Sequence, residues 1–469
     1  MINRRDFIKS AGAAVCATKL SSRTVFGLSR PNILIVITDE QSADAASYRI
    51  GTMYLHTPNM DSVAARGRVY TRAYCSNPLC VPSRTSMFTG QYPTVTGVMD
   101  NSDLKTAELN LKKVKLLGKI FEDASYETAY FGKWHIPCPT SENGIHGFAT
   151  AEMGRGKYGA NSVDTETAAN AASFIRRKHD SPFLAVASFL NPHNICEWAR
   201  GQRLPLGPIG NPPPANQCPP LRADHLPQKN EPEIVALMRH SYQAAPMFPV
   251  GSFDDVKWRQ YEWAYYRLIE KVDAQIGIVL QALRESGHER DTLIAMVADH
   301  GDCQGAHLWN QKTVFYEESS RVPFVLSHPG VIEPGRSERL VNTGIDLIPT
   351  LCDHAGIARP PGLPGLSVKN AAEDPRKYVV VSNKMVQGAP IDGSFPTSTG
   401  RMLRAQRYKY CAYSAGKEPE SLVDLREDPG EMVNLAVDPR FKRILDEHRA
   451  MLEEWCRATH DTFSVPRDA

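Results

Sequence analysis

Residues of the types that bind metal ions stand directly after two runs of apolar, strand-forming residues. Asp39 and Glu40 follow one run, and Asp299 and His300 follow another. Ligands of open α/β sheets gather at the carboxyl ends of the strands, so the two pairs are expected to meet at one sheet edge. Because carboxylate oxygens favour a hard cation, we expect one divalent ion, Ca²⁺ first, with Mg²⁺ or Mn²⁺ as alternatives.

A second group of chemically informative residues begins at Cys80. The segment reads Cys80-Val-Pro-Ser-Arg84-Thr-Ser-Met-Phe-Thr89-Gly90. It resembles the signature of the type I sulfatase family, in which the cysteine of Cys-x-Pro-x-Arg is oxidised to Cα-formylglycine and the segment ends in Thr-Gly. The resemblance implies that Cys80 becomes the nucleophile and, as an aldehyde hydrate, also a ligand of the metal.

A hydrated aldehyde suits this chemistry because a sulfate monoester is anionic and repels ordinary nucleophiles. One hydroxyl attacks sulfur, and the other later expels sulfate as the aldehyde re-forms. A neighbouring cation lowers the pKa of the attacking hydroxyl and neutralises the sulfate oxygens. Arg84 stands about one helical turn after residue 80. It is expected to hold the hydrate, since a guanidinium keeps its charge at working pH.

Four further basic residues match the family pattern in order along the chain. Lys133 and His135 stand in Phe-Gly-Lys-Trp-His, His193 follows Asn-Pro, and Lys312 lies in His-Leu-Trp-Asn-Gln-Lys. The resemblance implies that Lys133 grips a sulfate oxygen and that His135 takes the proton that lets sulfate leave. By the same resemblance, His193 contacts the bridging or a sulfate oxygen, and Lys312 assists the leaving group.

The same family pattern puts the metal ligands at the two strand ends identified above. Here those ligands are Asp39, Glu40, Asp299 and His300, together with residue 80. His300 departs from the commoner Asn of the calcium-dependent members. The identity of the metal therefore stays open.

Alternating strand and helix patterns predict the fold class. Apolar β-branched runs cover residues 32–38, 183–189, 292–298 and 323–326, and helical patterns cover residues 114–124, 166–178, 261–286 and 345–355. Strands of this kind are covered on both faces, which favours an α/β sandwich with a mainly parallel sheet. Strand-like residues 378–382 and 408–413 precede a helical pattern at residues 440–459. The resemblance implies an alkaline-phosphatase-like sandwich with a smaller C-terminal antiparallel sheet.

The N-terminus looks like a twin-arginine export signal. Residues 3–9 read Asn-Arg-Arg-Asp-Phe-Ile-Lys and precede a short, mildly apolar stretch. The predicted division is a signal peptide and short linker at 1–30, a catalytic domain at 31–370 and a C-terminal subdomain at 371–469. The implied partner is the twin-arginine translocase, and the implied location is periplasmic or secreted. Val15 is too large for the residue before a lipid-bearing cysteine, so Cys16 is not expected to carry an anchor.

Composition excludes some classes of function. At 469 residues and 42% hydrophobic residues, the chain can bury a large core. The net charge is +2, but the first 30 residues contribute +5, which leaves −3 for the remainder. We therefore expect no nucleic-acid-binding body, and no later stretch approaches a membrane span. The ten cysteines form no zinc-type cluster, although export would permit one or two disulfides.

The substrate is the least determined part of the prediction. Candidate specificity elements are Asp100, Asn101, Asn194, Glu197, Trp198 and the excursion at residues 201–232, which has nine prolines. Each could equally be plain loop structure. We expect a sulfatase that acts on a sulfated carbohydrate after a formylglycine-generating enzyme has matured Cys80. The alternatives are a phosphonate monoester or phosphodiester hydrolase of the same superfamily, and a catalytically silent binder of sulfated glycans.

Overall fold

The computed structural model describes residues 30–103, 113–138, 145–369, 376–386 and 388–467. The predicted signal peptide, at residues 1–29, lies outside the described residues. Residues 31–469 form one compact unit. The nine cysteines described within it are all free thiols, so the disulfides that export would permit are not formed among them.

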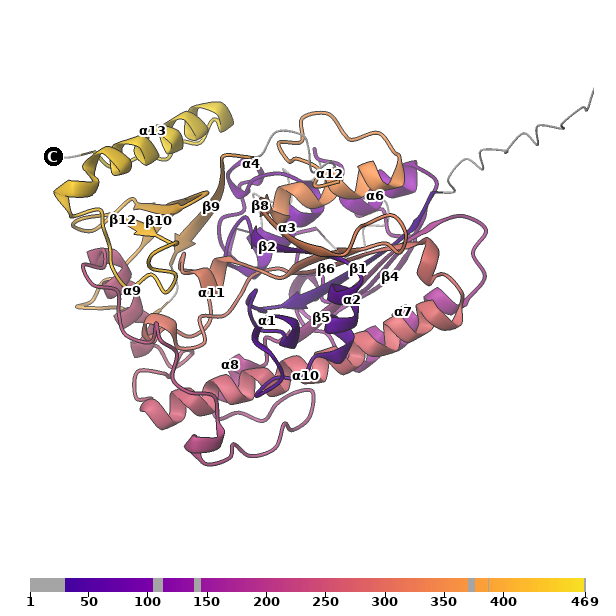
Figure 1. Cartoon of the computed structure of the whole chain (residues 1–469), viewed down its shortest axis with the longest axis horizontal. Helices are drawn as coiled ribbons and strands as arrows, with labels where there is room; N and C mark the ends of the chain where they lie inside the picture. The colour runs from indigo at the N-terminus through magenta and orange to yellow at the C-terminus, as the bar shows by residue number, and fades with distance from the viewer. Residues whose placement is uncertain (1–29, 104–112, 139–144, 370–375, 387, 468–469) are drawn as a thin grey trace, which may run out of the picture. The chain divides into compact units, whose positions relative to one another are not determined.

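The larger of two sheets has eight strands in the order β4-β3-β5-β1-β6-β7-β2-β8 (Figure 1). Among the described strands of this sheet, β7 alone runs antiparallel to its neighbours, and the other pairs are parallel. The predicted mainly parallel sheet is therefore confirmed. The strands are β1 Asn32–Asp39, β2 Arg68–Tyr74, β3 Glu127–Gly132, β4 Thr150–Met153, β5 Phe183–Pro192, β6 Thr292–Ala298, β7 Phe324–Ser327 and β8 Gly335–Asn342.

The three most apolar strands lie side by side at the centre of this sheet. β1 pairs with β5 on one side and with β6 on the other. Every residue of β5 and β6 is buried, as is all of β1 except Asn32. Burial on both faces explains why these strands are continuous apolar runs rather than alternating ones.

Helices cover both faces of the sheet (Figure 1). On one face, α3 Cys80–Thr89, α6 Leu117–Asp123 and α12 Thr343–Ala355 pack on alternate residues of β1, including Ile33 and Ile35. The opposite face carries α2 Pro58–Ala65, α7 Asp164–Arg176 and the long α10 Asp255–Glu285. The remaining α-helices outside the C-terminal region are α1 Ser47–Ile50, α4 Pro93–Thr96, α8 Ile195–Ala199, α9 Glu233–Ala244 and α11 Glu317–Ser320.

The smaller sheet is antiparallel and lies in the C-terminal part of the chain (Figure 1). Its strands are β9 Tyr378–Met385, β10 Ser398–Ala405, β11 Tyr408–Tyr413 and β12 Glu420–Asp424, and the last helix is α13 Lys442–Thr459. Leu445, Leu452 and Trp455 of α13 pack on one face of this sheet. The other face packs on α9 and on the segment around Phe315.

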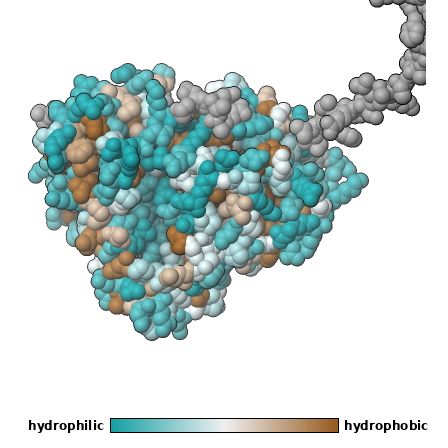
Figure 2. All heavy atoms as spheres, in the orientation of Figure 1, coloured by the Kyte–Doolittle hydropathy of each residue, from teal (hydrophilic) through white to brown (hydrophobic). Residues whose placement is uncertain are grey.

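The face of the molecule drawn in Figure 2 is largely polar. On the face drawn in Figure 2, hydrophilic residues dominate and hydrophobic residues occur in small separate groups. Within the described part of the chain, no helix combines the length and apolar character that a membrane span requires.

Candidate active site

The ends of two neighbouring strands bring the predicted acidic residues together. Thr38 of β1 pairs with Ala298 of β6, so Asp39 and Asp299 leave the sheet side by side. Cys80 is the first residue of α3, whose N-terminus reaches the same sheet edge. As the sequence predicted, the ends of β1 and β6 lie side by side, and the N-terminus of α3 lies next to them.

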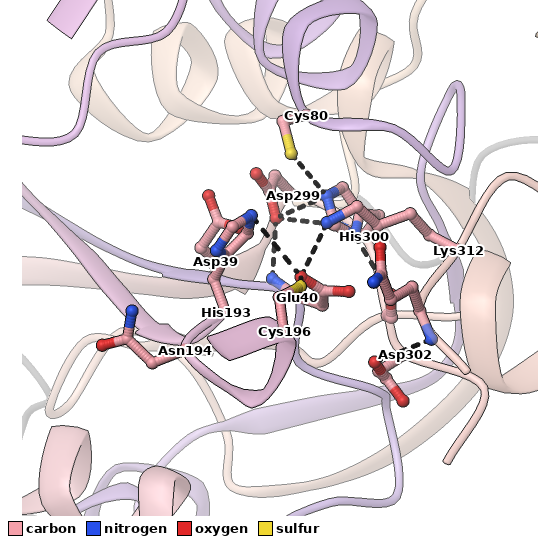
Figure 3. Close-up of polar contacts among 12 residues, drawn as sticks. Asp39, Glu40, Cys80, His193, Asn194, Cys196, Asp299, His300, Asp302 and Lys312 are labelled. Carbon is pink, nitrogen blue, oxygen red and sulfur yellow. Dashed lines mark hydrogen bonds and ion pairs between the residues drawn. The ribbon is translucent and has the colours of Figure 1, made fainter. Parts of the chain in front are cut away.

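Four of the predicted residues form one buried cluster (Figure 3). Ligand atoms of Asp39, Cys80, Asp299 and His300 all lie within 4.8 Å of one another. The Cys80 Sγ atom lies 3.1 Å from Nε2 of His300. Glu40 is adjacent to this cluster rather than part of it, since its Oε2 atom forms an ion pair with Nζ of Lys312 at 2.6 Å.

The carboxylate oxygens of this cluster and of the adjacent Glu40 are suited to bind a hard divalent cation. Oδ1 of Asp39 and Oε1 of Glu40 are buried without a hydrogen-bond partner among the described residues. Buried oxygens of this kind are costly unless a partner binds them. Burial and the nearby Asp39 carboxylate raise the pKa of Asp299. A cation would satisfy the free oxygens and relieve the repulsion between these two acids.

The backbone around the cluster is shaped to turn both acids inward. Glu40 has a φ of 68°, in the left-handed region that residues other than glycine seldom adopt. In this conformation its N–H donates to Oδ1 of Asp299 at 3.1 Å. The His300 N–H donates to the same atom at 2.9 Å. Strain of this kind is typical of functional sites.

Arg84 lies fully buried one turn along α3 and holds the acids in place. Its Nη2 atom donates to Oδ2 of Asp39, and its Nε atom donates to Oδ2 of Asp299, both at 2.8 Å. Its Nη1 atom donates to Ser188 Oγ and to the backbone oxygen of Lys133, both at 2.9 Å. These bonds run to the two acids, to β5 and to the backbone of Lys133. The expected contact of Arg84 with a hydrate at residue 80 stays a prediction.

The two predicted lysines form ion pairs with the two acids at the carboxyl end of β1. Lys133 Nζ lies 2.6 Å from Oδ2 of Asp39, and Lys312 pairs with Glu40. Burial raises the pKa of Cys80, but Lys312, Lys133 and His300 together outweigh it and hold that pKa well below its usual value. An anion at position 80 is therefore stabilised by the surrounding positive charge.

The two predicted histidines reach the same point from different loops. Nε2 of His193 lies 3.8 Å from Oε2 of Glu40 (Figure 3). Burial, with Lys312 and Lys133 nearby, lowers the pKa of His193 to about 4. Burial also lowers the pKa of His135, while the neighbouring Cys80 opposes that shift. His135 has no partner for Nδ1 among the described residues, so this atom is free to exchange a proton.

Sequence analysis missed three polar residues that support this site. Ser188 donates from Oγ to the Lys133 backbone oxygen at 2.8 Å, and its signal was a lone hydroxyl in an apolar strand. Cys196 places Sγ 3.6 Å from Oε2 of Glu40. Asp302 accepts hydrogen bonds from Tyr261 OH and Gln311 N, both at 3.0 Å. Cys196 follows the Asn-Pro-His motif but matched no pattern of its own, and Asp302 ends the Ala-Asp-His-Gly-Asp match but was assigned no role.

The candidate specificity elements separate into three places. Asn194, Glu197 and residues 205–206 of the proline-rich excursion line one cavity together with His193. Asp100 instead pairs with Lys384 of β9, and Asn101 Oδ1 accepts from the Val81 N–H at 3.1 Å. Trp198 lies apart from both, with Lys257 Nζ 4.2 Å from its ring centroid.

Comparison with known proteins identifies the family. The Sulfatase family matches residues 31–357, and the C-terminal part of the N-sulphoglucosamine sulphohydrolase family matches residues 305–458. The chain therefore belongs to the sulfatase family, as the Cys80 segment predicted. It is a sulfuric ester hydrolase with an alkaline-phosphatase-like fold.

Several relatives align with nearly the whole chain. The chain is 30% identical over 466 residues to the Δ4,5-hexuronate-2-O-sulfatase of Bacteroides thetaiotaomicron. The alignment covers 96% of this chain and 93% of that protein. It is 26% identical to the ulvan-active sulfatase of Formosa agariphila, over 92% of this chain and 82% of that one. A solved 2-O GAG sulfatase superposes with a TM-score of 0.80 at 28% identity, over 94% of this chain and 95% of that structure.

Proposed function

We propose that this sulfatase removes sulfate from a sulfated carbohydrate, using formylglycine made from Cys80 and one divalent ion. The relatives described above support the substrate class, since their names include a hexuronate and ulvan. The observation that carries the proposal is the convergence of the Cys80 thiol with three potential metal ligands within 4.8 Å. The thiol marks the position that the formylglycine oxygens would take.

The proposed metal ligands are Asp39, Glu40, Asp299 and His300, together with residue 80. The ion would supply positive charge that lowers the pKa of a hydroxyl at residue 80 and neutralises sulfate oxygens. Oxygen ligands favour Ca²⁺, with Mg²⁺ or Mn²⁺ as alternatives. Arg84 would keep the two aspartates in place through its bonds to both of them.

Lys133 and Lys312 would bind the sulfate group from two sides. Each ammonium is held by an acid at 2.6 Å and lies nearly buried. Positive groups fixed in a site with little water stabilise the charge that develops on the sulfate oxygens in the transition state. His193 or Lys312 is the proposed donor of a proton to the departing alcohol. Lys312 is the better donor, because its raised pKa keeps it protonated, whereas the lowered pKa of His193, about 4, leaves that imidazole neutral near pH 7.

Release of sulfate requires a base at residue 80. A formylglycine hydrate would supply one hydroxyl as the nucleophile and a second whose deprotonation expels sulfate. His135 is the proposed base, because burial keeps its imidazole neutral and its Nδ1 atom has no partner among the described residues.

The remaining proposals concern maturation and export. A formylglycine-generating enzyme would convert Cys80 before or during folding. The twin-arginine translocase would export the chain by residues 1–30, to the periplasm or beyond, which leaves a catalytic domain at 31–370 and a C-terminal subdomain at 371–469. The paired arginines Arg4 and Arg5 support the export route.

Mass spectrometry and a paired assay test the proposal. Protein co-expressed with the maturation enzyme is digested, and the peptide carrying residue 80 is expected to show the aldehyde mass. The same sample is then assayed on an aryl sulfate and an aryl phosphodiester, and faster turnover of the sulfate is expected. A thiol at residue 80 despite the maturation enzyme, or a clear preference for the diester, would contradict the proposal.

A further inference from the structure

A second group of side chains able to bind a metal lies beside the catalytic cluster (Figure 3). Glu40, His193 and Cys196 each place one ligand atom within 4.8 Å of the other two. Asp39 pairs with Pro192 across β1 and β5, so Glu40 and His193 leave the sheet side by side. Cys196 lies in the first turn of α8, which begins shortly after His193. We name these three residues the Glu-His-Cys group.

The spacing of the Glu-His-Cys group is close to that of a zinc site. Oε2 of Glu40 lies 3.6 Å from Sγ of Cys196 and 3.8 Å from Nε2 of His193. In a tetrahedral zinc site, bonds of about 2.0 Å to nitrogen or oxygen and about 2.3 Å to sulfur place the ligand atoms about 3.3–3.6 Å apart. Small side-chain rotations would close the difference.

The donor types distinguish this group from the catalytic cluster. The ion proposed for catalysis has mainly oxygen ligands, which favour Ca²⁺ or Mg²⁺. A thiolate, an imidazole and one carboxylate favour a softer ion, such as Zn²⁺. Cys196 would bind as the thiolate and release its proton to water. Two different ions can therefore be held next to each other, each by the ligands that suit it.

One side of the Glu-His-Cys group is open to solvent. Glu40 is fully buried and Cys196 is 2% exposed, whereas the side chain of His193 is 25% exposed and lines a cavity of about 550 Å³. An ion can enter from this cavity, where a water molecule would complete its coordination. Oε1 of Glu40 has no hydrogen-bond partner among the described residues. A cation on this carboxylate would relieve the cost of that buried oxygen.

The ion would compete with Lys312 for Glu40. Nζ of Lys312 lies 2.6 Å from Oε2 of Glu40, the atom that also faces Cys196 and His193. A divalent ion bound there would repel the ammonium group and occupy the lone pair of the imidazole. His193 and Lys312 are the two proposed donors of a proton to the departing alcohol. The ion would therefore remove both of them from the reaction.

We propose that Glu40, His193 and Cys196 form a binding site for Zn²⁺ or another soft divalent ion, and that the bound ion inhibits the enzyme. The inhibition rests on the proposed function, whereas binding of the ion does not. Excess Ca²⁺ is not expected to prevent this inhibition, because Ca²⁺ binds thiolate and imidazole poorly.

A cobalt spectrum tests the site without any assay of activity. Co²⁺ accepts the same ligands as Zn²⁺, and a thiolate bound to it gives a charge-transfer band in the near ultraviolet. The measurement uses Cys80→Ala protein in excess Ca²⁺, so that no thiol at residue 80 contributes. The band is expected in this protein and to be lost when Cys196→Ala is added. Adding Cys456→Ala instead, at a buried thiol of α13, should leave the band.

Titration with zinc tests the inhibition. Matured enzyme is assayed on 4-nitrophenyl sulfate in excess Ca²⁺, and each variant is compared with its own rate without zinc. Wild type and Cys456→Ala are expected to lose activity and to recover it with a zinc-selective chelator. Cys196→Ala should require a zinc concentration about tenfold higher or more for half inhibition. Cys196→Ser keeps the shape of the side chain and should show the same shift.

The outcomes separate the site from the proposed function. No cobalt band in Cys80→Ala protein, or a band that persists after Cys196→Ala, would overturn the site. Equal half-inhibiting zinc concentrations in wild type and in both Cys196 variants would overturn the inhibition, because the zinc would then act elsewhere. Failure of matured wild type to hydrolyse the aryl sulfate without zinc would contradict the proposed function, and the cobalt spectrum would still decide whether the site exists.

Discussion

Among the clusters of buried charge in the described residues, one lies at residue 80 and another lies beneath the C-terminal sheet. The second cluster is built from Glu317, Lys409 and Glu431. Lys409 Nζ lies 2.5 Å from Glu431 Oε1 and 3.2 Å from Glu317 Oε1. It joins β11 to α11 and to the turn after β12, so we name it the junction cluster. Both clusters are nearly free of solvent.

The two clusters differ in how completely their oxygens are used. In the junction cluster, Glu317 Oε2 accepts from Tyr74 OH at 2.9 Å, and Glu431 Oε2 accepts from the Glu317 N–H at 2.7 Å. All four carboxylate oxygens there have partners. At the candidate active site, Asp39 of the metal-ligand cluster and the adjacent Glu40 each retain one buried oxygen without a hydrogen-bond partner among the described residues. Burial of charge alone therefore does not mark a ligand site; what distinguishes the active site is that its buried acids lie close together and keep carboxylate oxygens without a partner.

Removing the nucleophile should give the largest effect and leave the junction cluster intact. Cys80→Ala removes the thiol that maturation would oxidise, so no formylglycine can form, and kcat/KM on an aryl sulfate is expected to fall by about 10⁴-fold or more. Thermal denaturation should show a melting temperature close to that of wild type. Retained turnover would disprove the assignment of residue 80, and a collapsed melting temperature would show that the catalytic cluster is also structural.

Breaking the junction cluster should lower the stability of the fold more than the activity. Lys409→Met removes the cation between two buried acids, and the free energy of unfolding at pH 8 is expected to fall by about 3–5 kcal/mol. The matched control is Lys442→Met, whose exposed ion pair with Asp446 is worth at most about 0.5 kcal/mol. Denaturant titration measures both variants. A loss below about 1 kcal/mol for Lys409→Met would mean that the junction pairs contribute little.

The pH dependence of stability should report on the same cluster. Burial raises the pKa of Glu431 to about 7, although Lys409 opposes the shift. A raised pKa means that the folded state still holds a proton at pH values where the unfolded state, with a pKa near 4.5, has lost it. The bound proton stabilises the folded state, and this stabilisation is lost as the pH rises through 7. The stability of wild type relative to Glu431→Gln should therefore fall by about 3 kcal/mol between pH 4.5 and pH 8. Denaturant titration at several pH values measures this difference, and a flat profile would contradict it.

Binding of a metal ion should stabilise the folded state through the active site and not through the junction cluster, and this effect is the smallest of the four. At a concentration of Ca²⁺ or Mg²⁺ about 100 times its dissociation constant, the folded state gains about 2.7 kcal/mol, and a chelator removes this gain. Asp39→Asn should reduce the gain, whereas Lys409→Met should leave it, because the junction cluster has no unused oxygen. Thermal denaturation with and without the ion tests this. An equal gain in the Asp39→Asn variant would place the ion elsewhere.

The sequence predicted the central strands of the larger sheet better than the strands nearer its edge. The apolar runs at residues 32–38, 183–189 and 292–298 became β1, β5 and β6, which lie side by side. β2 and β8 were not predicted, because Arg68–Tyr74 and Gly335–Asn342 mix charged and apolar residues. Such outer strands are covered on fewer sides, so their composition carries a weaker signal.

Site residues were predictable where a motif fixed their type and spacing. The motifs located Cys80, Asp39, Asp299 and His300, which the structure brings together. They could not show that Arg84 turns toward the acids, because that direction depends on how α3 lies against β1 and β6. Nor could they reveal the junction cluster, in which Glu317 and Glu431 meet although 114 residues separate them.

The reversed direction of β7 has a consequence for the whole catalytic edge. β6 ends at this edge and β7 starts from it, so the chain between them returns without crossing the sheet. This one stretch carries Asp299, His300 and Lys312, and five residues later it supplies Glu317 to the C-terminal sheet. Without the C-terminal sheet, Glu317 would lose its partner Lys409, and Lys312 would be held in place less firmly. The position of Lys312, the proposed sulfate-binding lysine, therefore depends on the same short segment that contacts the smaller sheet.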